Sequence, residues 1–137
     1  MMSNHPRFSE IMFADLPVDG SVQGGLRPVL IVQNDVGNQY SSTVEVIPLT
    51  SRTNKAKHMP THVPVRPDAR NGLRKESVVL AENVVTIPKT RLREHIGFAS
   101  RSLMAQVGQA RYIQSPLPIG AWGQPRLRDR LVSSLAR

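Results

Sequence analysis

The stretch that decides the fold is G-G-L-R-P-V-L-I-V-Q-N, residues 24–34. Its two glycines permit backbone dihedrals that other residues avoid, while Pro28 fixes its own φ and biases Arg27 toward extended geometry. The run V-L-I-V, residues 29–32, is too short for an ordinary helix and rich in β-branched residues, which predicts a buried strand. Arg27 is therefore expected at the mouth of a rigid strand, beneath a flexible Gly-rich loop. A guanidinium fixed there is a good anion receptor, because its planar fork matches two phosphate oxygens.

Short strands and turns extend outward from this stretch. Strands are predicted over about 10–14, 27–33, 43–49 and 61–65, with Pro64 placing the last of these at a sheet edge. Residues 77–87 give the longest strand pattern, residues 34–38 read as a turn, and helical patterns follow over 89–96 and 100–114. Ser100 is a candidate cap for the second helix. This order predicts a mainly β fold, a small antiparallel barrel with short helices and a C-terminal helix.

Length and composition restrict the classes of protein that are possible. One domain is expected for 137 residues, and the absence of cysteine excludes disulfides and thiolate metal sites. No apolar run approaches the roughly 20 residues needed to span a bilayer, and the N-terminus lacks the apolar core of a signal peptide, so we expect a cytoplasmic protein without a membrane partner. The excess of 18 Lys and Arg over 10 Asp and Glu, a formal charge of +8, favours a polyanionic partner.

Three segments are expected along the chain. Residues 1–8 read as a flexible leader, residues 9–114 as the folded domain, and residues 115–137 as a Pro-rich connector with a basic tail. The tail carries four arginines and one aspartate, which favours a mobile arm that adds affinity for a polyanionic partner. The alternative is that Leu127, Leu131 and Leu135 pack on the barrel or on a partner subunit.

Several motifs along the chain occur together in a known family. These are S-V-Q-G-G-L-R-P-V-L-I-V-Q-N-D-V-G-N-Q-Y-S-S-T-V-E-V-I-P-L-T-S at 21–51, K-A-K-H-M-P-T-H-V at 55–63, S-V-V-L-A-E-N-V-V-T-I-P-K at 77–89 and L-R-E-H-I-G at 92–97. In order and spacing they resemble the MazF/PemK family of toxin endoribonucleases, over roughly residues 10–97. The resemblance implies an SH3-like barrel with an appended helix, which agrees with the fold class predicted from the strand pattern.

The resemblance also implies site residues. Arg27 and Thr50 match the family's catalytic arginine and threonine, although a strand-end threonine taken alone is usually a structural hydroxyl. The candidate substrate-binding residues are Ser21, Gln23, Gly24, Asn34, Ser51, Glu82 and Asn83. The chain departs from the family at Val22, Val85 and Pro88, which bears on base recognition and on activity.

The implied function is a metal-independent endoribonuclease toxin without a cofactor. It would cleave single-stranded RNA by attack of the 2′-OH and leave 2′,3′-cyclic phosphate and 5′-OH ends. The expected partners are single-stranded RNA, an acidic cognate antitoxin and a second copy of the chain in a homodimer. Two alternatives stay open, a degenerate family member that binds RNA or antitoxin without cutting, and a gyrase poison similar to CcdB, which shares the fold.

The histidines give no metal site in this interpretation. His58 and His62 are four residues apart, a spacing that suits a metal only on a helix, and Pro60 between them disfavours a helix. His95 lies on the predicted helix 89–96, where a packing or surface role is expected.

Overall fold

An antiparallel sheet makes up most of the described chain. The computed structural model describes residues 5–17, 24–53 and 59–118. In chain order the elements are β1 (Glu10–Leu16), β2 (Gly25–Ile31), α1 (Asp35–Tyr40), β3 (Thr43–Thr50), β4 (His62–Val65), β5 (Ser77–Leu80), β6 (Val85–Pro88), the 3-10 helix η2 (Lys89–Arg91), β7 (Leu92–Phe98) and α2 (Arg101–Gln114). The strands pair in the order β4-β5-β3-β2-β1-β7, with β6 on β3. The prediction of a mainly β fold is confirmed. The strand path has two ends, so the sheet is barrel-like without being closed. Pro64 lies on an edge strand, β4, as expected.

The central strands are buried on both faces, which explains their continuous apolar runs. In β2, Leu30 packs in one cluster with Ile11, Ile47 and the helix α2, while its neighbours Val29 and Ile31 pack in a second cluster. Because successive side chains of a strand point to opposite faces, a single strand supplies both cores. Such a strand is held from both sides, and this fixes the position of the residues at its ends.

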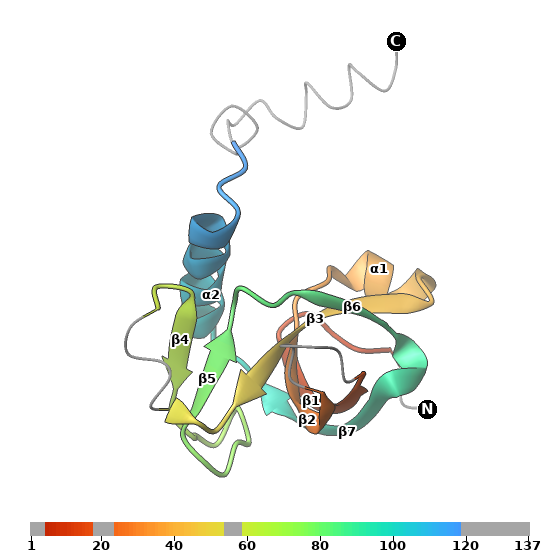
Figure 1. Ribbon diagram of the computed structural model, residues 1–137. Coiled ribbons are helices and arrows are strands. Elements are labelled where there is room, and N and C mark those ends of the chain that lie inside the picture. The colour runs from red at the N-terminus through yellow and green to blue at the C-terminus, as the bar shows by residue number, and fades with distance from the viewer. Residues whose placement is uncertain (1–4, 18–23, 54–58, 119–137) are drawn as a thin grey trace.

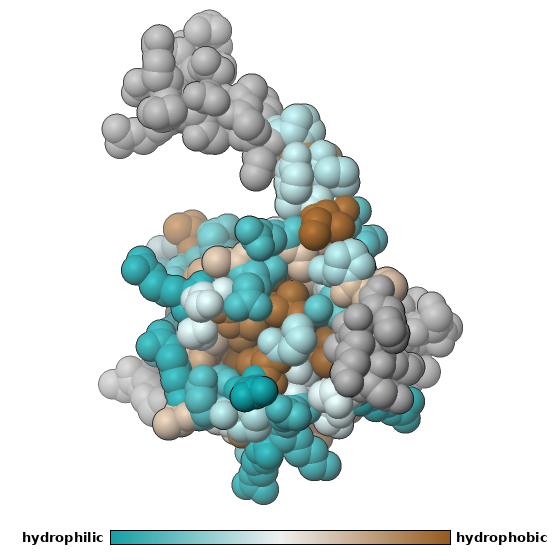
Figure 2. Space-filling model, turned by 90° about the vertical axis from the view of Figure 1, so that its left-hand side faces the viewer, coloured by the Kyte–Doolittle hydropathy of each residue, from teal (hydrophilic) through white to brown (hydrophobic). Residues whose placement is uncertain are grey.

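The two helices lie at different ends of the sheet. α2 stands beside β4, and α1 lies on the far side of the molecule (Figure 1). The apolar face of α2, with Leu103, Val107 and Ala110, packs on the first cluster, and the predicted cap is confirmed because the Ser100 hydroxyl accepts the N–H of Leu103 at 3.0 Å. From the β4 side the surface shows apolar side chains gathered in a hollow among hydrophilic ones (Figure 2). No helix within the described residues is long and apolar enough to cross a membrane.

The helix predicted over 89–96 is wrong. Only Lys89–Arg91 is helical, and the rest belongs to β7, so His95 lies on a strand. This strand pairs with β1, with Ile11 opposite Gly97 and Met12 opposite His95, and its register shifts beside these pairs. The irregular register hides the two-residue alternation in the sequence, and pairing with β1 outweighs the helical spacing of the apolar residues.

Two further predictions are also corrected. The single strand expected over 77–87 is broken after Leu80, where the N–H of Asn83 bonds to the Leu80 carbonyl at 2.9 Å and closes a turn. Continued along β3, the register of β5 (Leu49 opposite Val79) would set Glu82 opposite Val46, but Val85 lies there, so the break takes up three extra residues. The segment 34–38, expected as a turn, instead forms the N-cap and the first residues of the short helix α1, which Asn34 caps by accepting the N–H of Gly37 at 2.9 Å.

Candidate active site

The site begins where β2 and β3 part. Their pairing ends at Val29 opposite Pro48, and beyond that point β3 pairs with β5, with Thr50 opposite Val78. Continuing the β2–β3 register by two residues would set Arg27 opposite Thr50. Because the β2–β3 pairing stops before this pair, Arg27 and Thr50 lie on the two sides of the opening between the strands.

A pocket of about 750 Å³ lies at this opening, and both Arg27 and Thr50 line it. Its volume is within the range of about 300–1,000 Å³ that is typical of ligand sites. Apolar side chains form part of its wall, among them Phe13 of β1, Leu26 of β2, Ile96 of β7 and Leu73 of the segment before β5. An apolar wall beside a fixed cation suits a ligand that carries both a flat apolar group and an anion.

Local contacts hold the two candidate catalytic residues. An Nη2–H of Arg27 donates to the Gly24 carbonyl at 3.4 Å, and Thr50, only 7% exposed, accepts the backbone N–H of Arg52 at 3.2 Å on its hydroxyl. Burial lowers the pKa of Arg27 below its ordinary value, and the positive charge of Arg52 lowers it further. An arginine nevertheless keeps its charge near neutral pH. Arg27 is thus a permanent cation in a partly desolvated position.

The pocket carries an excess of positive charge. Its lining includes four cationic residues, Arg27, Arg52, Arg74 and Lys75, and a single carboxylate, Glu94. His95 also lines it. Cations grouped with few carboxylates raise the local positive potential and attract polyanions.

Sequence reasoning missed Arg52, Arg74 and Lys75 as members of this site. Arg52 comes two residues after Thr50, and R-K-E at 74–76 lies in a turn-rich segment immediately before a strand. For Arg52, its position at the end of a strand was a usable signal. No local pattern brings 74–75 to the same place as 27 and 50.

The candidate substrate-binding residues separate into three groups. Ser51 lines the pocket with Thr50, and Gly24 contacts Arg27 through its carbonyl. Asn34, Glu82 and Asn83 do not line it: Asn34 caps α1, and the Glu82 carboxylate lies 2.8 Å from His62 Nε2. Ser21, Gln23 and the departure Val22 lie outside the described residues. The roles of all these residues stay predictions.

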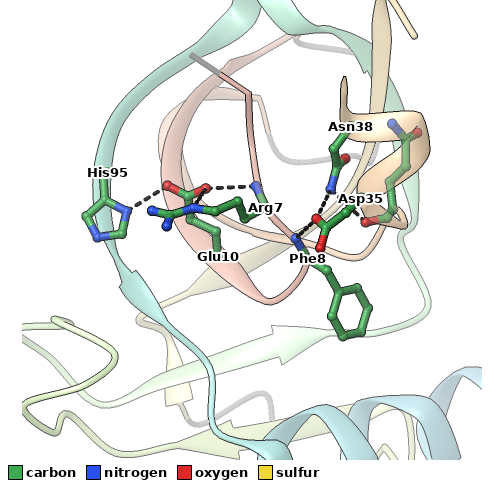
Figure 3. A network of polar contacts seen from close by, with 7 residues as sticks. Arg7, Phe8, Glu10, Asp35, Asn38 and His95 are labelled. Carbon is green, nitrogen blue, oxygen red and sulfur yellow. Dashed lines mark hydrogen bonds and ion pairs between the residues drawn. The ribbon is translucent and has the colours of Figure 1, made fainter. Parts of the chain in front are cut away.

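A second polar cluster joins the N-terminal segment to the sheet (Figure 3). Glu10 lies between Arg7 and His95; its carboxylate accepts the backbone N–H of Arg7 at 2.9 Å and lies 2.6 Å from His95 Nδ1. Asp35 accepts the N–H of Phe8 at 2.8 Å and the amide of Asn38 at 3.1 Å. Carboxylates and donors match in this cluster, as expected for a structural network.

The described residues contain no group of three or more His, Cys, Asp or Glu side chains placed to hold a metal ion. His62 pairs with Glu82, and His58 lies outside the described residues.

Comparison with known sequences identifies the family. Residues 7–112 match the family described as PemK-like, MazF-like toxin of type II toxin-antitoxin system. The chain belongs to this family. Within it, an "Endoribonuclease MazF" from Staphylococcus saprophyticus is 48% identical over 105 residues, covering 76% of this chain and 86% of that protein. The resemblance in the sequence is thereby confirmed, and the endoribonuclease class that it implies agrees with the name of this relative.

Solved MazF structures share the fold. The Mycobacterium tuberculosis toxin MazF-mt6 has a TM-score of 0.66 and 32% identity, covering 80% of this chain and 98% of that one. A mycobacterial endoribonuclease in complex with its cognate antitoxin has a TM-score of 0.64 and 26% identity, covering 85% and 98%. These neighbours confirm the barrel-like architecture expected for the MazF/PemK family.

Proposed function

We propose that this chain is an endoribonuclease toxin that cleaves single-stranded RNA in the pocket between β2 and β3. The observation that carries the proposal is the position of Arg27 and Thr50 on the two sides of the strand opening, in a pocket with an excess of cations. Membership in the MazF/PemK family supports it.

Arg27 and Thr50 suit an intramolecular transesterification, in which the RNA is cleaved by its own 2′-oxygen. The 2′-oxygen forms a bond to the adjacent phosphorus, the bond from phosphorus to the 5′-oxygen breaks, the 2′-OH gives up its proton and the leaving 5′-oxygen gains one. Negative charge grows on the phosphoryl oxygens, where the guanidinium of Arg27 and the hydroxyl of Thr50 supply fixed stabilisation. Arg27 stabilises charge and does not serve as the base, because its guanidinium stays protonated. The RNA supplies its own nucleophile, so the proposed reaction needs no metal.

The same proposal includes the partners. A cognate antitoxin with an acidic segment would neutralise the cationic pocket, and the solved mycobacterial relative is in complex with its antitoxin. Exposed apolar side chains at the end of α2 and just beyond it, Tyr112, Ile113 and Leu117, support contact with a second copy of the chain. The expected compartment is the cytoplasm, where the RNA substrate is available.

One cleavage assay tests the activity and its chemistry together. Purified protein is incubated with mixed-sequence RNA in EDTA, and the new 5′ ends are mapped. We expect cuts that recur at one short motif, with 5′-OH ends that a polynucleotide kinase labels without phosphatase treatment, and 2′,3′-cyclic phosphates on the other fragment. RNA left intact with and without added Mg²⁺ would favour a non-cleaving member of the family, and cleavage only with the metal would refute the metal-independent route.

A further inference from the structure

Three cations of the pocket come from two loops that the catalytic proposal does not use. Arg52 follows β3, and Arg74 and Lys75 precede β5; all three side chains are exposed and line the pocket with Arg27. They have no role in the catalytic step proposed for Arg27 and Thr50.

The loop that carries Arg74 and Lys75 is held by a buried asparagine. Asn71, 2% exposed, donates its side-chain amide to the Arg66 carbonyl at 2.8 Å. Its amide oxygen accepts the N–H groups of Asp68 at 3.1 Å and Leu73 at 3.0 Å. One side chain thus ties together the start, the middle and the end of the loop.

Close packing on β7 fixes the same loop. Gly72 has φ +67°, and a Cβ there would lie 2.1 Å from the Ile96 carbonyl oxygen, while a Cβ on Gly97 would lie 2.4 Å from the backbone of Asn71. The N–H of Phe98 bonds to the Arg70 carbonyl at 2.9 Å. On the other side, the Ser77 hydroxyl donates to the Lys75 carbonyl at 2.9 Å. Arg74 and Lys75 are therefore presented from an ordered backbone, which reduces the entropy lost on binding.

Only one carboxylate, that of Glu94, lines the pocket together with these three cations. Within the part of the chain that the structure describes, no ion pair joins Arg52, Arg74 or Lys75 to a carboxylate. Arg66 on the same loop differs, because it pairs with Glu76 at 3.6 Å outside the pocket. A fixed group of cations without carboxylate partners is arranged to receive an external anion.

We propose that Arg52, Arg74 and Lys75 form a phosphate rim, which binds the RNA backbone beside the linkage that is cut. The inference rests on the proposed function and adds to it a division of work: Arg27 and Thr50 act on the scissile phosphate, and the rim binds flanking phosphates without reading bases. Single-stranded RNA offers several phosphates in succession, which matches cations spread over two loops better than a single small anion does.

The test compares two pairs of neutralised residues on one loop. Arg74→Gln with Lys75→Gln removes two charges from the rim, and Arg66→Gln with Arg70→Gln removes two from the same loop outside the pocket. Binding of a 2′-O-methylated, uncleavable single-stranded oligonucleotide of mixed sequence is measured at several salt concentrations. Each lost contact to single-stranded RNA lowers the slope of log affinity against log salt by about 0.7, so the rim pair should lower it by about 1.4 and added Arg52→Gln by about 2 in total. The control pair should leave the slope unchanged.

Further readouts separate a rim from a general charge effect. Arg74→Lys keeps the charge and should retain the slope, the cleavage motif should stay the same in every variant, and melting temperatures should match because the replaced side chains are exposed. Equal slope changes in the rim and control pairs, or no change in either, would overturn the proposal. The proposal would also be overturned if the Arg74→Gln/Lys75→Gln variant bound polyglutamate more weakly than the wild type while its salt slope for RNA stayed unchanged. The loops would then bind an acidic protein segment.

Failure of the rim and failure of the nuclease give different results. A wild-type protein that cuts RNA while the rim pair binds with an unchanged slope refutes the rim alone. A wild-type protein that binds RNA with the predicted slopes and does not cut refutes the nuclease and leaves the rim in place.

Discussion

The molecule has two polar regions that differ in how their charges are matched. In the cluster of Figure 3, Glu10 and Asp35 accept hydrogen bonds from Arg7, Phe8, Asn38 and the His95 ring. The lining of the pocket has four Arg and Lys side chains and a single carboxylate. Matched donors and acceptors contribute to stability, whereas an excess of one charge costs stability and is useful only when a ligand brings the other. We assign the first region to the scaffold and, under the proposed function, the second to binding.

The comparison predicts that substitutions in the pocket change activity and that substitutions in the cluster change stability. The largest effect is expected for Arg27→Ala, which should slow RNA cleavage by about 100-fold or more, the scale for losing one donor to a developing oxyanion. Its melting temperature should stay near that of the wild type, since removal of one cation relieves repulsion with Arg52. Arg27→Lys should restore only part of the rate, because an ammonium lacks the planar fork. Wild-type cleavage by folded Arg27→Ala would remove Arg27 from the site.

The opposite result is expected for Glu10→Gln. Glu10 is 4% exposed, and its carboxylate holds both the N-terminal segment and β7, so the neutral amide should lower the free energy of unfolding by about 1–3 kcal/mol. Urea unfolding measures this loss. The folded fraction should still cut the same RNA motif. A variant with full stability and lost cleavage would contradict the assignment of this cluster to the scaffold.

Thr50→Val tests whether the Thr50 hydroxyl, which lines the pocket and also accepts a backbone N–H, acts in cleavage or in stability. The substitution keeps the β-branched shape and removes the donor, so cleavage should fall by about tenfold, or about 1.4 kcal/mol in the barrier. Stability should change little, because the N–H of exposed Arg52, which bonds to this hydroxyl at 3.2 Å, can bond to water instead. Thermal melting and initial cleavage rates on the same sample measure both. A large fall in melting temperature with the rate retained would make Thr50 structural.

Features that depend on local interactions could be predicted from the sequence, and features that depend on contacts between distant segments could not. The buried run after Arg27 and the edge position of Pro64 follow from local chemistry, and the Ser100 cap is predictable because its hydroxyl accepts an N–H only three residues further along the chain. The strand Leu92–Phe98 was mistaken for a helix because its pairing with β1 is irregular. Arg74 reaches the pocket through Asn71 and the packing of Gly72 on Ile96. Such placement depends on contacts between distant segments, which no sequence window contains.

The smallest effect is expected for Asp35→Asn and depends on pH. The backbone N–H of Phe8 lowers the pKa of Asp35 in the folded protein, with further lowering by Asn38 and Arg7. A lowered folded-state pKa means that the ionised carboxylate adds stability above the unfolded value of about 3.9, and that this contribution is lost as the pH falls through the folded value. The variant should therefore be slightly less stable than the wild type near neutral pH, and the difference should vanish in acid. Unfolding free energies measured across this range check the trend, with Glu45→Gln, an exposed carboxylate on β3, as the charge-matched control. A difference that stays constant with pH would show that the shape of the Asp35 side chain stabilises the N-terminal segment and that its charge does not.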